Sequence, residues 1–283
     1  MGENKTSLLN TSVLIEHANQ PREQERQSED YILVTKGLLG VFDSVGGRDK
    51  GRLVSHLAGR VIATAWRSLS EAERQGPPEQ LEAVLQALIR QADTAIANLP
   101  IPPEHKRPAT TAALCALFAH QGQAHAAVAH IGDSRVYLLR AGQPLCRLTK
   151  DNGYFSFAVR HQQLTEEEAL RIEQAEQAED LLPEQQAHFV RRNKITCAVG
   201  WSDFSRIQTS SLTLFPGDRV LLCTDGVHDN LTDQEIEEIL LAATDKPGAQ
   251  SLVNAAMERS QQAHFRAKRD DMSAIVAWYQ CSC

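Results

Sequence analysis

The sequence predicts an α+β fold: two antiparallel β-sheets packed as a central sandwich and flanked by helices on both sides, an αββα arrangement. One observation behind this prediction is that short apolar strand patterns recur along nearly the whole chain. The other is that two pairs of helix patterns are inserted between them. No internal repeat or low-complexity linker interrupts residues 5–280, so we expect residues 1–283 to form a single domain.

The first third of the chain contains strand patterns followed by two helix patterns. The strands, rich in β-branched and apolar residues, are expected at residues 7–16, 31–35 and 38–42. Residues 50–70 carry apolar side chains at spacings of three and four, which predicts an amphipathic helix. Pro77-Pro78 ends this pattern, and a second helix with the same spacing is expected at residues 81–99.

From residue 111 onwards the pattern returns to strands. We expect an antiparallel meander at residues 111–119, 124–131, 135–140 and 144–148. Residues 152–194 interrupt the strands with an acidic helical segment at 165–180, and we interpret them as a mobile excursion. The chain then closes with strands at 207–214, 219–224 and 273–280 and helices at 232–243 and 249–264.

The composition is that of a soluble globular chain, with 42% hydrophobic and 23% charged residues. The net charge of −7 argues against a nucleic-acid-binding surface as the main purpose. The first twenty residues lack the apolar core of a targeting segment, and the longest nearly apolar run, residues 112–119, is far shorter than the roughly 18 residues of a membrane span. We therefore expect a cytoplasmic monomer that binds neither nucleic acid nor membrane.

Six cysteines, at positions 115, 146, 197, 223, 281 and 283, show no regular spacing. Three of them lie inside apolar runs, so we expect reduced thiols rather than a disulfide framework. The closing Cys281-Ser282-Cys283 could bind metal or oxidise, but we interpret it as a frayed terminus. The histidines show no ligand spacing, and we assign no role to His125, His130 and His228.

Three aspartates stand where strand patterns end or begin. Asp43 and Asp225 each follow an apolar run, and Asp270 precedes the last strand. Carboxylates at strand ends are held rigidly while facing solvent, and hard divalent cations prefer several such oxygen ligands. The glycine-rich turn after Asp43 also lets the carbonyl of Ser44 approach an ion. Each turn alone is open to the simpler interpretation of ordinary turn chemistry, whereas the three together indicate a metal site.

Seven short motifs follow one another along nearly the whole chain. They are Ser28-Glu29-Asp30, Val41-Phe42-Asp43-Ser44-Val45-Gly46-Gly47, Ala109-Thr110-Thr111-Ala112, Ile131-Gly132-Asp133-Ser134-Arg135, Pro216-Gly217-Asp218, Leu221-Leu222-Cys223-Thr224-Asp225-Gly226 and Asp270-Asp271-Met272-Ser273. In this order they resemble the motifs of the metal-dependent serine/threonine protein phosphatases, the PPM or type 2C family, in its bacterial form. The shared order makes the resemblance specific, although each motif is short.

The resemblance implies the ligands of two Mn²⁺ or Mg²⁺ ions. Asp43 matches the acid that bridges both ions, and the carbonyl of Ser44 matches a ligand that completes one of them. Asp225 and Asp270 match the acids that hold the other ion. Asp133 matches an acid that, together with Asp225, can hold a weaker third ion.

The resemblance also implies residues that act around the ions. Glu29 and Asp30 match acids that orient metal-bound waters. Residues 152–194 fall where the family carries its flap. We interpret the acidic part of this flap, residues 166–180, as a solvated face, with selection of basic phosphopeptides as the alternative.

The predicted chemistry follows from charge. Three carboxylates carry −3 against +4 from two divalent ions, so the site stays positive enough for a phosphate. A water shared between ions about 3.5–4 Å apart becomes a nucleophile near neutral pH, and the ions neutralise the phosphoryl oxygens during in-line displacement. No cysteine is followed six positions later by arginine, which counts against a phosphocysteine mechanism. The oxygen ligands suit Mn²⁺ and Mg²⁺ alike.

Three positions depart from the family pattern. Where the family carries a phosphate-binding arginine, the chain has Glu25, and Arg26, one place away, is the predicted substitute, with Arg22 as the alternative. Ser44 replaces a glycine, which costs on the order of 1 kcal/mol if that position needs a positive φ. Val45 replaces a histidine proposed as general acid in many relatives, so a metal-bound water is expected to protonate the leaving group.

Two functions of different class follow. One is an active hydrolase, a protein phosphatase that acts on phosphoserine or phosphothreonine in phosphorylated protein substrates, with Asp43, Asp225 and Asp270 as its catalytic acids. The other is a pseudophosphatase, a phosphoprotein-binding or regulatory module with little turnover, which Glu25 and Ser44 would suit. We favour the enzyme because the metal-motif positions all keep oxygen ligands.

Overall fold

The computed structural model describes residues 4–8, 11–23, 25–45, 51–100, 107–201 and 204–280. Within these ranges the strands form two antiparallel sheets and one small pair. In spatial order the first sheet holds β1 (Asn4–Leu8), β2 (Thr11–Gln20), β13 (Met272–Gln280), β12 (Arg219–Cys223), β9 (Arg135–Leu139) and β10 (Cys146–Arg147). The second holds β11 (Gln208–Thr213), β8 (Gln123–Ile131), β7 (Ala112–His120), β4 (Leu38–Phe42) and β3 (Tyr31–Thr35). β5 (Ser44–Val45) pairs with β6 (Ala109–Thr110).

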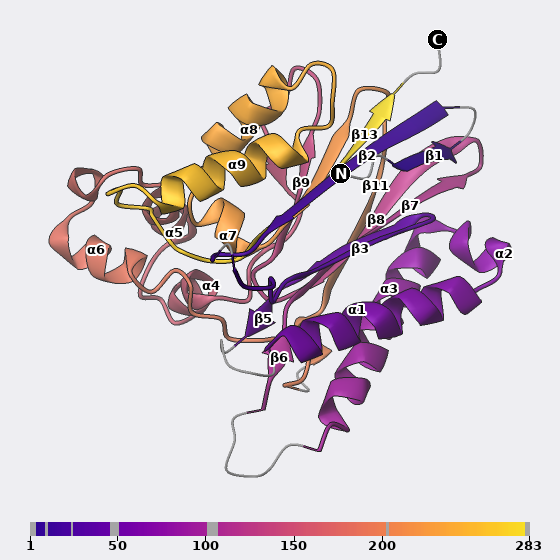
Figure 1. The fold of residues 1–283 in the computed structure, drawn as a ribbon, viewed down its shortest axis with the longest axis horizontal. Helices are drawn as coiled ribbons and strands as arrows, with labels where there is room; N and C mark the ends of the chain where they lie inside the picture. The colour runs from indigo at the N-terminus through magenta and orange to yellow at the C-terminus, as the bar shows by residue number, and fades with distance from the viewer. Residues whose placement is uncertain are drawn as a thin grey trace.

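Helices cover both outer faces of the sandwich (Figure 1). α1 (Gly51–Ser68), the short α2 (Glu71–Arg74) and α3 (Pro78–Ala97) lie on the side of the second sheet. α8 (Asp233–Ala242) and α9 (Ala249–Ser260) lie on the side of the first sheet. The predicted αββα class is therefore confirmed.

The alternation of side chains along β4 explains why its sequence is an unbroken apolar run. Leu38 and Phe42 point into the core shared with α1 and α3, while Leu39 and Val41 point into the core between the two sheets. Successive residues of a strand face opposite sides. A strand with a helix layer on one side and a second sheet on the other must therefore be apolar at every position.

The expected strand at residues 7–16 is wrong, because the chain forms two strands there. β1 and β2 pair with each other, and β2 continues to Gln20 because it pairs with β13 from Ser12 to Gln20. The expected meander is wrong as well, since β8 and β9 belong to different sheets. The chain crosses between them at Gly132, whose φ of +109° suits glycine and whose missing Cβ would lie 2.7 Å from the side chain of Thr111.

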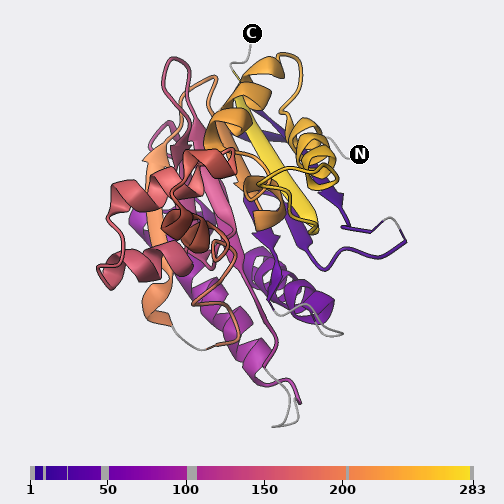
Figure 2. The ribbon, with the colours of Figure 1, turned by 90° about the vertical axis from the view of Figure 1, so that its left-hand side faces the viewer.

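Residues 152–194 form a lobe of short helices beside the sheets, which Figure 2 shows from a second side. The lobe contains α4 (Tyr154–Arg160), α5 (Glu166–Glu173), a 3₁₀ turn η1 (Ala178–Asp180) and α6 (Pro183–Phe189). The single acidic helix expected at 165–180 is thus wrong. α5 ends early because the buried guanidinium of Arg266 donates hydrogen bonds to the carbonyls of Glu173 and Ala175. Ile172, Ala175, Leu181 and Phe189 give the lobe an apolar core of its own.

The remaining predictions concern the cysteines, the turn glycines, the chain terminus and a membrane span. Cys115, Cys146, Cys197 and Cys223, the cysteines in the described ranges, form no disulfide. The turn glycines Gly46 and Gly47 and the terminal residues 281–283 lie outside the described residues. No helix in the described ranges is long and apolar enough to cross a membrane.

Candidate active site

The predicted acids converge on one cavity of about 210 Å³ at one end of the sandwich. It draws on the loop before β3, the turn after β4, the end of the flap, the start of α7 (Asp225–His228) and the start of β13. The lining residues are Arg22, Glu29, Asp43, Ser44, Val45, Thr111, Asp133, Asn193, Ile195, Asp225, Lys268, Asp270 and Asp271. Asp30 lies beside the cavity, where its Oδ2 accepts a hydrogen bond from Thr224 Oγ1 at 2.9 Å.

The backbone of Asp43 is held by two threonines of the Ala109-Thr110-Thr111-Ala112 motif. Its carbonyl accepts hydrogen bonds from the N–H of Thr111 at 2.8 Å and from the hydroxyl of Thr110 at 2.7 Å. Its own N–H donates to Thr111 Oγ1 at 2.9 Å. The motif therefore fixes the position from which the Asp43 carboxylate enters the cavity.

Ser44 fits its position without backbone strain. Among the described non-glycine residues, only Gln121 and Gln162 have a positive φ, so the cost expected for a serine at position 44 does not arise. The Ser44 hydroxyl donates to Glu29 Oε2 at 2.8 Å. Gly51 packs against both side chains, because a Cβ there would lie 2.6 Å from Ser44 Oγ and 2.7 Å from Glu29 Oε2.

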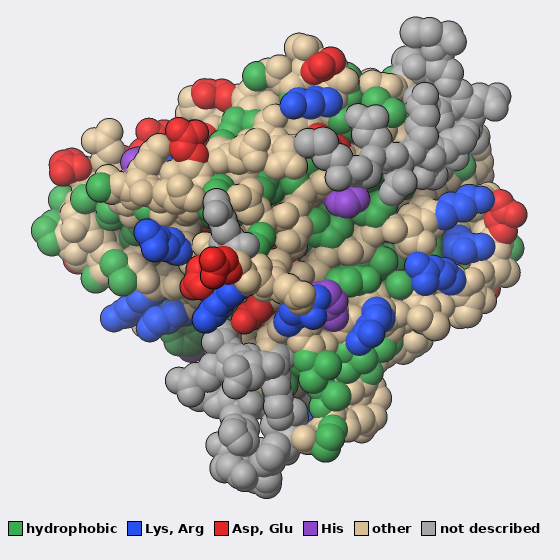
Figure 3. Space-filling view, in the orientation of Figure 1, with side chains coloured by type: hydrophobic (Ala, Val, Ile, Leu, Met, Phe, Trp, Pro, Cys, Tyr) green, Lys and Arg blue, Asp and Glu red, His purple; other side chains and the backbone are tan. Residues whose placement is uncertain are grey.

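Of the two candidate arginines, the structure brings Arg22 to the cavity. Its guanidinium lies 3.5 Å from Glu29 Oε1 and lines the acid cavity. Arg26 does not line it: its side chain is 62% exposed, pairs with Glu23 at 3.0 Å, and borders a separate groove between β2, β3 and α1. Figure 3 shows acidic and basic side chains gathered on this face over the loop between β2 and β3.

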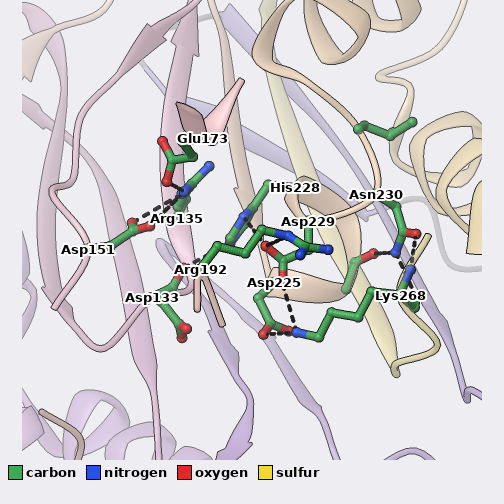
Figure 4. Close-up of polar contacts among 12 residues, drawn as sticks. Asp133, Arg135, Asp151, Glu173, Arg192, Asp225, His228, Asp229, Asn230 and Lys268 are labelled. Carbon is green, nitrogen blue, oxygen red and sulfur yellow. Dashed lines mark hydrogen bonds and ion pairs between the residues drawn. The ribbon is translucent and has the colours of Figure 1, made fainter. Parts of the chain in front are cut away.

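Lys268 was not foreseen from the sequence, although it stands among the predicted acids (Figure 4). Its ammonium donates a hydrogen bond to Asp225 Oδ2 and another to Asp229 Oδ2 at 2.8 Å, and lies 3.0 Å from Asp270 Oδ2. Within the described ranges, no three histidine, cysteine, aspartate or glutamate side chains converge closely enough to ligate one ion. The carboxylates are instead arranged around this ammonium.

Asp229 was also missed, and helix spacing could have found it. It lies four residues after Asp225 at the end of α7, so both carboxylates share one face of this turn. Arg192, from the end of the flap, reaches Asp229 Oδ1 at 3.5 Å. The flap is thereby linked through Asp229 and Lys268 to the acids of the cavity.

A buried charge cluster ties the flap to the strand that follows Asp133. The guanidinium of Arg135 donates to Asp151 at 2.6 Å and to Glu173 of α5, and its side chain is only 2% exposed. Nearby, the backbone carbonyl of Asp133 lies 2.9 Å from His228 Nε2. The buried ion pairs of Arg135 therefore hold the start of the strand that follows Asp133, and with it the loop that carries Asp133.

The acids repel one another and are buried, so their ionised forms are disfavoured. Burial and the neighbouring Asp30 and Asp225 raise the pKa of Asp43 well above its usual value. Burial raises the pKa of Asp30 to about 7 and that of Asp225 to about 6, the latter against the opposing effect of Lys268. Burial and Asp225 likewise raise the pKa of Asp133. Such a cluster favours any added positive charge.

The donor set fits a hard divalent cation in its chemistry. Every candidate ligand in the cavity offers oxygen, which Mg²⁺ and Mn²⁺ prefer. Asp225 Oδ1 is buried and has no hydrogen-bond partner, and the same holds for Asp30 Oδ1. A buried carboxylate oxygen without a partner is costly unless something else satisfies it, and an ion or its water would do so.

Two family models match the chain. The model described as protein phosphatase 2C matches residues 3–188, and that of stage II sporulation protein E (SpoIIE) matches residues 181–280. The serine/threonine protein phosphatase PstP of Mycobacterium tuberculosis is 30% identical over 231 residues, which are 81% of this chain but 39% of PstP. The serine/threonine phosphatase stp of Listeria monocytogenes is 26% identical over 200 residues, 71% of this chain and 70% of stp.

The fold has counterparts among solved structures. The catalytic domain of PstP, described as a complex with 2 manganese ions, superimposes with a TM-score of 0.71 at 24% identity and covers 95% of this chain and 99% of that domain. This likeness establishes the fold. The chain thus spans about two fifths of the length of the whole PstP protein, and nearly all of the PstP catalytic domain.

Proposed function

This chain belongs to the protein phosphatase 2C family, and from that membership we propose that it hydrolyses phosphoserine and phosphothreonine in proteins with the help of divalent metal ions. One observation supports this most: Asp43, Asp133, Asp225 and Asp270, which are far apart in sequence, line one cavity together with a guanidinium. The curated relatives PstP and stp are serine/threonine phosphatases. The pseudophosphatase alternative loses its motivation, because Ser44 is unstrained and Arg22 supplies a cation.

Two ions, Mn²⁺ or Mg²⁺, are proposed as cofactors, and the PstP domain in complex with 2 manganese ions supports that number. Asp43, the backbone carbonyl of Ser44, Asp225 and Asp270 would hold them. A third ion at Asp133 is taken up below. When bound, such ions acidify a water and neutralise the oxygens of a phosphoryl group.

The chain's own side chains then bind and orient the substrate. Arg22 is proposed to bind the phosphate, because its guanidinium lines the cavity and offers paired donors to phosphate oxygens. Asp30 offers a free carboxylate oxygen that can accept a hydrogen bond from water, and Glu29 is held in place by Ser44. Val45 is apolar and donates no proton, so the leaving group takes its proton from a water.

The substrates, the oligomeric state and the cellular compartment are proposed as well. We propose phosphorylated proteins as substrates and a cytoplasmic monomer as the working form. The four described cysteines form no disulfide, which is the usual state of cysteines in a reducing compartment. Gel filtration with light scattering would test the monomer.

The experiment that tests the function is hydrolysis of a phosphothreonine peptide by the purified chain. The activity is measured after chelation and again with Mn²⁺ or Mg²⁺ restored. Turnover that disappears on chelation and returns with metal supports the proposal. If the folded protein binds metal and still releases no phosphate, the role of a phosphoprotein-binding module replaces it.

A further inference from the structure

Lys268 is built into the acid cavity by its backbone as well as by its side chain. Its N–H donates to Asn230 Oδ1 at 2.9 Å, and its carbonyl accepts from Asn230 Nδ2 at 3.0 Å. Asn230 follows directly after Asp229, so these two bonds fix the lysine relative to the turn that carries Asp225 and Asp229. The backbone from which the lysine side chain extends is therefore fixed, and the side chain itself is only 16% exposed.

The ammonium uses one edge of Asp225 and leaves the other edge open. Oδ2 of Asp225 accepts from Lys268, whereas Oδ1 is buried without a partner. Both oxygens of Asp229 face basic side chains, with Lys268 at Oδ2 and Arg192 at Oδ1. Oδ1 is thus the oxygen of Asp225 that remains for an ion, while Asp229 is already neutralised by side chains of the same chain.

The balance of charges around the cavity also favours one ammonium together with two metal ions. Seven carboxylates, those of Glu29, Asp43, Asp133, Asp225, Asp229, Asp270 and Asp271, line the cavity or pair with Lys268. Two guanidiniums, of Arg22 in the lining and of Arg192 on Asp229, neutralise two of these negative charges. Two divalent ions neutralise four more, which leaves one negative charge for a further cation. Lys268 supplies that charge.

We propose that Lys268 is a tethered cation whose contacts to Asp225 and Asp229 take the place of the third metal ion predicted at Asp133 and Asp225, so that the chain binds two ions rather than three. The inference rests on the metal-dependent function proposed above. It also gives Asp229 a role, as the acid that holds the ammonium between the flap arginine and the cavity.

The test counts the metal ions bound without measuring turnover. Chelated protein is dialysed against increasing Mn²⁺, and the bound manganese per chain is determined by atomic absorption. We expect two ions in the unaltered chain and three in Lys268→Met over the same range of free Mn²⁺. Lys150→Met is the matched control, since Lys150 is exposed and pairs only with Glu166 among the described ionised side chains, and it should bind two ions.

Two further variants make the outcome specific. Lys268→Arg keeps the charge and should still bind two ions, and Lys268→Met combined with Asp229→Asn should lose the added ion. An equal manganese count and affinity in Lys268→Met and the unaltered chain would overturn the tethered-cation role while leaving the phosphatase proposal intact. Absence of bound Mn²⁺ from both proteins would overturn both proposals. If Lys268→Met does not fold, Lys268→Gln takes its place, and a third ion in Lys268→Gln would support the proposal. A third ion in Lys268→Arg, which keeps the charge, would contradict it.

Discussion

The carboxylate of Asp271 accepts the backbone N–H of Glu29 at 2.6 Å, although 242 positions separate the two residues. Its other oxygen accepts the N–H of Arg22 at 2.8 Å. The start of β13 therefore holds the loop that carries both a carboxylate and a guanidinium of the cavity. Asp271 itself is 5% exposed, and its part is to position this loop.

We expect Asp271→Ala to lower the free energy of unfolding by about 2 kcal/mol, because two backbone N–H groups lose a buried acceptor. The KM for a phosphopeptide should rise as well, since the loop that carries Arg22 is released. Asp271→Asn keeps one acceptor oxygen, so its stability and its KM should lie between those of the unaltered chain and those of Asp271→Ala. Urea unfolding and initial rates measure both effects, and an alanine variant with unchanged stability would contradict the anchoring role.

The sequence located the acids because local patterns mark them. Asp43, Asp225 and Asp270 each adjoin a long apolar run, and a run of this kind becomes a buried strand whose end faces solvent. Lys268 stands in no such local pattern. Its position depends on hydrogen bonds between its backbone and the side chain of Asn230, which is remote in sequence. Arg26 was predicted ahead of Arg22, whereas Arg22 lines the cavity, because the loop is held by Asp271 from the far end of the chain.

The errors in the fold have a similar origin. Strand patterns at 31–35 and 38–42 were predicted with the observed limits, since β3 and β4 pair with each other locally. The meander prediction failed because hydrophobic alternation indicates a strand but not the sheet to which it belongs. β8 and β9 are both largely buried strands, and the chain passes from one sheet to the other at the turn that contains Gly132.

Asp225→Asn should lower kcat by at least about a hundredfold, which corresponds to about 3 kcal/mol of barrier. An amide is a poorer ligand for a divalent cation than a carboxylate, and it also removes one negative charge that pairs with Lys268. Circular dichroism should show an intact fold. Asp245→Asn, at an exposed position, is the control, and an Asp225→Asn enzyme with normal turnover would refute the assignment of the site.

Arg22→Ala should raise the KM for phosphopeptides about tenfold or more and change kcat less, because its guanidinium lines the cavity and is proposed to bind the phosphate. Arg26→Ala, on the same loop but paired with Glu23 and exposed, is the matched comparison and should change KM little. The two variants are compared by steady-state kinetics. The reverse ranking would assign phosphate binding to Arg26.

Arg135→Ala should destabilise the chain by about 3–5 kcal/mol, since it leaves Asp151 and Glu173 without their shared buried partner. The flap should loosen at α5, which hydrogen exchange can follow separately from global unfolding. Arg160→Ala, at an exposed position of α4, provides the control. Equal urea midpoints and m-values for the two variants would show that the charge cluster adds no stability.

His130 should make the folded chain sensitive to acid without any part in catalysis. It is fully buried on β8, and burial, with a smaller effect of Arg135, lowers the pKa of its imidazole to about 3. Between about pH 6.5 and pH 3 the unfolded chain therefore binds a proton at this position that the folded chain does not. Its contribution to stability is complete above about pH 6.5 and declines as the pH falls, by about 2 kcal/mol at pH 5.

His130→Leu removes this titration, so the free energy of unfolding of the unaltered chain should fall by about 2 kcal/mol relative to that of His130→Leu between pH 7 and pH 5. The slope that remains in the variant combines His228, whose lowered pKa acts in the same direction, with Asp30 and Asp225, whose raised pKa values act in the opposite direction. Urea unfolding of metal-free protein at several pH values gives the slopes, and parallel slopes for the unaltered chain and His130→Leu would show that position 130 does not titrate differently on folding.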